Sequence, residues 1–169
     1  QPSANEEGEV VAALIDLRDL MDRNFGPHKG WLVTSDAALR RGDYKTALAF
    51  IEGGLKKHPG NDELLNARAL AMFIASDAQL TPAVALALEK AKASKWHPGP
   101  YYFDGLAHLS DQQPEKTLAL WETTLTRGTP KGEWRAPVQA QLDALVNMMA
   151  QVDAAEKVQA AEQTGAAQP

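Results

Sequence analysis

The chain has 169 residues, of which 44% are hydrophobic and 23% are charged, a balance typical of a globular domain. Its formal net charge is −5 and its 17 basic side chains are scattered, so no nucleic-acid-binding face is expected. Cysteine is absent, which excludes disulfides, cysteine-ligated zinc and thiol catalysis within this chain. No apolar run reaches the length of about 18 residues that predicts a membrane helix. We therefore expect membrane contact only through an anchor or partner outside this chain.

Apolar residues recur at helical spacing along most of the chain, and glycine and proline fall mostly between these periodic stretches. Asp43 is placed to cap a helix that begins at Tyr44. Thr81 offers a similar cap, and Pro82 suits the first turn of the helix that follows. The pattern predicts an all-α fold with helices at 7–24, 29–41, 44–57, 62–76, 82–94, 99–110, 114–127 and 134–152.

One stretch follows the tetratricopeptide (TPR) signature, in which Trp, Tyr, an A-x3-F pair and Pro recur at fixed offsets over about 34 residues. Trp31 takes the tryptophan position, Ala47 and Ile51 take the A-x3-F positions, and Pro59 closes the repeat. The departures are Thr34, Ser35 and Ala38, which stand where Leu, Gly and Tyr are usual. Residues at matching offsets further along are more degenerate. The sequence therefore predicts a TPR-like helical-repeat solenoid, and an ordinary helical bundle is the alternative.

The predicted domain covers residues 7–152 and contains about three helix pairs between an N-terminal and a C-terminal capping helix. The capping helices are expected because the last face of a repeat stack needs cover. Residues 1–6 are expected to be flexible, and 153–169, rich in Ala and Gln without an apolar stripe, to be disordered. The repeats and the C-terminal capping helix are placed near 28–61, 62–97, 98–131 and 134–152.

The first helix of each pair in such a stack lines a concave groove that binds a segment of another protein. Most of the predicted groove residues are apolar or aromatic, which suits an amphipathic helix whose polar groups Arg40 or Asn66 would orient. The alternative for each apolar position is burial in the core. Lys29 and Glu63 lie in the first turns of the two predicted helices that contain Arg40 and Asn66. The predicted groove residues are Leu32, Asp36, Leu39, Arg40, Asn66, Leu70, Phe73, Tyr102 and Leu106.

An enzyme is the second class of function that the residues leave open. Asp104 and His108 are four residues apart on one predicted helix, where they share a face and offer an acid–base pair or two metal ligands. No third ligand is apparent, and the HExxH, GxSxG and phosphate-loop motifs are absent. We therefore expect a binding module, not an enzyme, with no metal or other cofactor.

The chain resembles the periplasmic TPR domain of the bacterial cytochrome c maturation protein of the CcmI/CycH type, which is related to NrfG-like TPR subunits. The resemblance extends over about residues 10–150. The stretches that carry it are Val10–Leu20, Gly30–Leu32, Tyr102–Ala107, Leu118–Trp121 and Thr129–Arg135. Thr129–Arg135 is the most specific of them, because Trp134 and Arg135 open a closing helix.

The resemblance implies a chaperone and not a catalyst. Members of this family hold apocytochrome c, chiefly by its C-terminal helix, and present it to the haem ligation machinery. It also implies a periplasmic location, with a tether to the inner membrane supplied by a segment outside this chain. The alternative is a TPR adaptor or scaffold for another cell-envelope complex, since TPR motifs do not specify one function.

Overall fold

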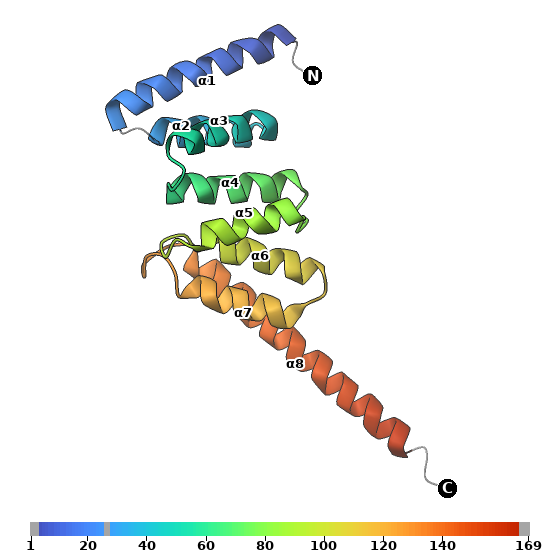
Figure 1. Cartoon of the computed structure of the whole chain (residues 1–169). Helices are drawn as coiled ribbons and strands as arrows, with labels where there is room; N and C mark the ends of the chain where they lie inside the picture. Colours follow the sequence, from blue (N-terminus) through green and yellow to red (C-terminus); the bar gives the residue numbers. More distant parts are fainter. Residues whose placement is uncertain (1–3, 26–27, 166–169) are drawn as a thin grey trace.

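The computed structural model describes residues 4–25 and 28–165, and this part of the chain forms eight α-helices (Figure 1). Each lies within a few residues of its predicted place except at the two ends of the chain. The helices are α1 (Ala4–Phe25), α2 (Lys29–Arg40), α3 (Tyr44–Lys57), α4 (Asp62–Ala75), α5 (Pro82–Lys92), α6 (Gly99–Ser110), α7 (Pro114–Leu125) and α8 (Arg135–Gly165).

Local capping interactions explain why several helices begin where the sequence predicts. The Asp43 side chain accepts a hydrogen bond from the Thr46 backbone N–H at 3.0 Å, which satisfies one unpaired donor of α3. The Thr46 side chain and, second, its backbone N–H lower the pKa of Asp43 by hydrogen bonding. Thr81 caps α5 in the same way, and Pro82 occupies its first turn. Asn61 caps α4 by accepting from the Leu64 N–H at 2.9 Å, a cap that we did not predict.

The helices form a stack of three pairs, α2 with α3, α4 with α5 and α6 with α7, flanked by α1 and α8 (Figure 1). The first helices of successive pairs also touch, since α2 contacts α4 and α4 contacts α6. The two ends of the chain lie at opposite ends of the stack. This arrangement confirms the predicted helical-repeat solenoid.

Tryptophan rings fill the space between the two helices of the first and third pairs. Trp31 of α2 lies against Gly53 of α3, where an added Cβ would stand 2.5 Å from the ring. Trp121 of α7 lies against Gly105 of α6 in the same way. Both rings are buried, with 7% and 3% of their surface exposed. Glycine is therefore required at these two crossings by close approach of a large side chain.

The first half of α8 closes the lower end of the stack. Its buried stripe, Val138, Leu142 and Leu145, is at most 8% exposed, and the two leucines pack in one cluster with Trp121 of α7. Val146, which the helical pattern places on the same side, is 45% exposed. At the other end Leu14 of α1 packs into the core that contains Trp31.

The second half of α8 corrects the prediction of a disordered tail, because the helix continues to Gly165 instead of ending at 152. Residues 150–163 are exposed, so packing against the stack does not hold them in place (Figure 1). The physical reason is local: the segment consists largely of Ala, Gln, Glu and Lys, which are strong helix formers, and the packed first half nucleates the helix. At the other end α1 begins at Ala4, within the stretch expected to be flexible, and residues 1–3 and 166–169 lie outside the described residues.

Replacing Gly105 by Ala is expected to destabilise the stack. The new Cβ would lie 2.4 Å from Trp121 Nε1, so the ring or the helix must move, at a cost of about 1–3 kcal/mol. Urea denaturation followed by circular dichroism measures this loss. Gly8→Ala is the matched control, because a Cβ at Gly8 meets nothing within 4 Å. Equal stabilities for both variants would contradict the close approach of Trp121.

Ending the chain after Gln151 is expected to leave the melting temperature unchanged, because residues 152–163, the removed residues whose side chains the structure describes, are exposed and add nothing to the core. Removing α8 from Arg135 onward is expected to cause aggregation, because it uncovers the apolar surface around Trp121. Thermal denaturation and light scattering measure both effects. A loss of several degrees in the shorter truncation would show that the exposed half of α8 does contribute to folding.

Candidate peptide-binding face

An open pocket of about 400 Å³ lies between α2 and α4, the first helices of the first two pairs. Leu32, Asp36 and Leu39 lie on one face of α2 because their spacing of four and three residues matches the helical period. Asn66 and Leu70 face them from α4. These five predicted groove residues therefore line one pocket. The remaining lining residues are Lys29, Ser35, Glu63, Ala67 and His97.

Ion pairs neutralise the charges at the pocket. Lys29 Nζ lies 2.6 Å from one carboxylate oxygen of Glu63, and His28 Nε2 lies 3.1 Å from the same oxygen. The hydrogen bond from Lys29 is the main reason that the pKa of Glu63 is lowered. Beside the pocket, exposed Arg40 pairs with Asp36 at 2.8 Å, and this hydrogen bond raises the pKa of Arg40. The pocket therefore presents carbon surface and balanced charge, not a cluster of unpaired cations.

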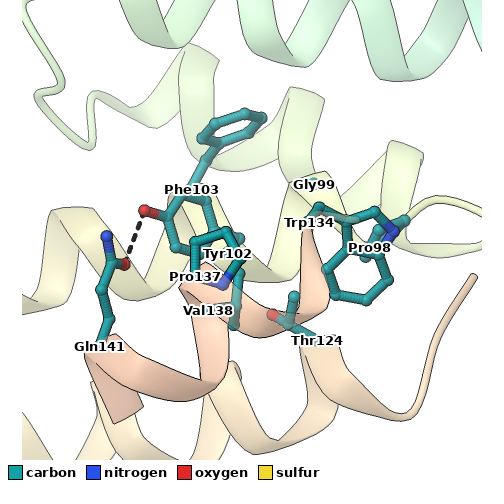
Figure 2. A pocket seen from close by; sticks show the side chains of 9 residues that line it. All are labelled: Pro98, Gly99, Tyr102, Phe103, Thr124, Trp134, Pro137, Val138 and Gln141. Atoms are coloured by element: carbon teal, nitrogen blue, oxygen red, sulfur yellow. Dashed lines mark hydrogen bonds between the residues drawn. The ribbon is translucent and has the colours of Figure 1, made fainter. Parts of the chain in front are cut away.

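Tyr102, another predicted groove residue, lies in a second pocket of about 310 Å³ between α6 and α8 (Figure 2). Its ring stacks on Trp121 with the ring centres 5.7 Å apart. Its hydroxyl donates a hydrogen bond to Gln141 Oε1 at 2.8 Å, which links α6 to α8. Six of the nine predicted groove residues thus line one of the two pockets, and Arg40 lies beside the first of them.

Two predicted groove residues lie elsewhere. Phe73 is only 5% exposed and packs on Phe103, with 5.4 Å between the ring centres, so its placement in an open groove is corrected to the core. Leu106 is partly buried and packs against both core clusters of the second half of the stack. In both cases the neighbouring helix covers the side chain, which is the alternative that the sequence left open.

Asp104 and His108 do come together, but within a structural ion pair. His108 Nε2 lies 3.5 Å from one oxygen of Asp104, and Lys92 Nζ lies 2.5 Å from the other. Asp104 is 8% exposed. Burial lowers the pKa of Lys92, but the hydrogen bonds to Asp104 and Glu89 outweigh it and leave the pKa raised. Among residues 4–25 and 28–165, no cluster of three or more histidine, aspartate or glutamate side chains suits a metal ion.

Sequence reasoning missed several residues that line the two pockets. His97 and Pro98 belong to a short segment between α5 and α6 that we interpreted only as a turn. Trp134 carries part of the sequence resemblance, yet nothing in its pattern indicates that its ring forms a pocket wall. An aromatic residue at the first position of the predicted capping helix is the one signal that pointed to this place.

The stacked pairs, with their first helices α2, α4 and α6 forming one inner row, define the chain as a TPR-type helical-repeat solenoid. The first TPR domain of Spaghetti (RPAP3), solved with the HSP90 peptide SRMEEVD bound, is similar to it, with a TM-score of 0.56. That match covers 73% of this chain and 95% of the other, at 20% sequence identity, so it shows the fold alone. No family model and no curated protein matches the sequence. No helix in the described part of the chain is both long and apolar enough to cross a membrane.

Replacing Lys92 by Met is expected to lower the free energy of unfolding by about 3 kcal/mol, because Asp104 would stay buried without its cation. Because folding raises the pKa of Lys92, the pair stabilises the fold at neutral pH and loses this effect only as the pH rises above 10.5. Urea denaturation at pH 7 measures the loss. Adding Asp104→Leu to the Lys92→Met variant is expected to restore most of it, and failure to do so would contradict the role of the pair.

Proposed function

We propose that this chain is a peptide-binding TPR module whose ligand lies along the inner row of helices. The observation that carries the proposal is the open pocket between α2 and α4, where Leu32, Leu39 and Leu70 leave carbon surface accessible beside Asp36 and Asn66. A surface of this mixed kind suits a short amphipathic segment. Apolar side chains of the ligand fill the pocket, while polar groups at its edge form hydrogen bonds with the backbone or side chains of the ligand.

The charges of the pocket favour a ligand that is less acidic than the peptide bound by the similar TPR domain. That peptide, SRMEEVD, carries three carboxylate side chains near its end. Here Lys29 is held by Glu63, and Arg40 is held by Asp36, so neither cation is free to receive a carboxylate without losing its partner. The pocket therefore suits the apolar face of an amphipathic helix better than it suits an acidic tail.

The finer proposal is an apocytochrome c chaperone that holds the amphipathic C-terminal helix of its client and presents it to the haem ligation machinery in the periplasm. Its support is the sequence resemblance together with the apolar character of the pocket. The absence of cysteine is consistent with it, because the chain cannot form mixed disulfides with the thiols of its client. The competing function is an adaptor for another cell-envelope complex, which would use the same pocket for a different segment.

A peptide that copies the C-terminal helix of a c-type cytochrome is expected to bind with micromolar affinity or better, as measured by calorimetry. Leu70→Ala is expected to weaken binding by about tenfold, because one leucine contributes on the order of 1.5 kcal/mol when it is buried by the ligand. Leu86→Ala is the matched control, since Leu86 on α5 is 57% exposed and lines neither pocket.

Three outcomes would count against the proposal. Equal binding of a scrambled peptide would show that the contact is non-specific. No binding of such helices from several cytochromes would overturn the chaperone role and favour the adaptor. If the cytochrome peptide binds and Leu70→Ala and Leu86→Ala weaken it equally, the peptide-binding site is not the pocket between α2 and α4.

A further inference from the structure

The pocket between α6 and α8 is almost entirely apolar. Tyr102 and Phe103 form one side of it, and Pro137 and Val138 of α8 form the other, with Trp134 at one end (Figure 2). Its volume of about 310 Å³ is at the lower limit of typical ligand pockets, so it suits one chemical group and not a whole helix. None of its lining residues is charged; the others are Pro98, Gly99, Thr124 and Gln141.

The Trp134 wall is held firmly in place by the loop before α8. Gly132 leaves room for the ring, since an added Cβ would stand 2.2 Å from Trp134 Nε1. Arg135 stacks on the ring at 4.8 Å, and its guanidinium donates hydrogen bonds to the carbonyl oxygens of Thr129 at 2.9 Å and Arg127 at 2.8 Å. The wall is therefore already formed without a ligand, which reduces the entropy lost on binding.

The two hydroxyl groups at this pocket already have partners. The Tyr102 hydroxyl is used by Gln141, and the Thr124 hydroxyl donates to the Leu120 carbonyl oxygen at 2.9 Å. A ligand group that enters the pocket therefore meets mainly carbon surface and two hydroxyl groups that are already hydrogen-bonded. A polar group would lose its hydration there without compensation, whereas an apolar group would gain from the transfer.

This pocket continues the face that carries the pocket between α2 and α4. Pro98 and Gly99, which line it, directly follow His97, which lines the other pocket. Gly99 also lies beside Asn66 of α4, since an added Cβ would be 3.5 Å from its Oδ1. The row of first helices thus has its charged side chains at the α2 and α4 end and an uncharged pocket at the α6 and α8 end.

We propose that the pocket between α6 and α8 is an anchor site that takes one bulky apolar side chain, leucine, isoleucine or phenylalanine, of the peptide ligand. This inference rests on the proposed peptide-binding function and gives the ligand a direction. Its amphipathic part lies along the pocket between α2 and α4, with its polar groups beside the ion pairs, and its anchor residue enters beside Trp134. Complementarity of charge and polarity along the face, not area alone, favours this orientation.

The first test uses single side chains as probes and needs no knowledge of the natural ligand. N-acetyl-leucinamide and N-acetyl-phenylalaninamide are titrated into the protein. N-acetyl-alaninamide is the control, because it has the same backbone groups and a much smaller apolar side chain. The readout is the NMR signal of the Trp134 indole N–H, assigned by comparison with Trp134→Phe. We expect millimolar binding that shifts this signal, at least about fivefold tighter than the alanine analogue.

A pair of variants shows whether the probes enter the pocket. Gln141→Phe places a ring at its rim, where Gln141 is exposed, and is expected to abolish the shift. Gln139→Phe adds the same ring on the same helix outside the pocket and is expected to change nothing. Equal binding of the alanine analogue, or an unchanged shift in Gln141→Phe, would overturn the anchor site.

The same variants separate this inference from the proposed chaperone role. If the cytochrome peptide binds, Gln141→Phe should weaken it by about tenfold while Gln139→Phe does not, and equal affinities would overturn the anchor site alone. If the cytochrome peptide fails to bind while the leucine and phenylalanine probes still shift the Trp134 signal, the chaperone role falls. The anchor site is then supported for a different peptide ligand.

Discussion

The stack depends on tryptophan rings that lie directly on glycine backbone where two paired helices cross. Trp31 occupies the space that a side chain at Gly53 would fill, and Trp121 does the same at Gly105. A large ring against a bare helix lets the pair approach closely while its core stays filled, so both spacing and volume are fixed by one contact. These crossings set the spacing within the first and third pairs, and contacts of α4 with α2 and α6 align the three helices into the row that carries both pockets.

The two pockets differ because the side chains along the row of first helices are charged at one end and uncharged at the other. At α2 and α4, charged side chains are present but satisfy one another, as Lys29 does with Glu63. At α6 and α8 the lining is uncharged, and the few polar groups are bound within the wall. A charge that already has a partner within the protein changes the binding free energy little unless the ligand offers a better partner. An apolar pocket, in contrast, favours binding of any group that excludes water from it. The selectivity for an amphipathic ligand that we propose would follow from the arrangement of groups that the protein has already satisfied.

The helices and their pairing were predictable because caps and apolar periodicity are local properties of the sequence. The alignment of Leu32, Asp36 and Leu39 follows from helical geometry alone. Whether a face stays open depends on the neighbouring helix, which is why Phe73, covered by Phe103, was wrongly placed in the groove. The Trp134 wall depends on the path of a loop, and no periodic pattern encodes that path. The prediction of a disordered tail failed for the opposite reason. The helix there needs only local helix propensity and no apolar stripe.

The capping helix α8 links the stability of the stack to the site. Val138 is buried among the residues that cover the last pair, and it also lines the pocket beside Trp134. A group that enters this pocket binds only the folded stack, so it adds to stability in proportion to the logarithm of its concentration over its dissociation constant. In a stack where each pair contacts mainly its neighbours, this gain is greatest at α6, α7 and α8 and smallest at α1. The cap is therefore both the end of the fold and the part of it that senses an apolar ligand.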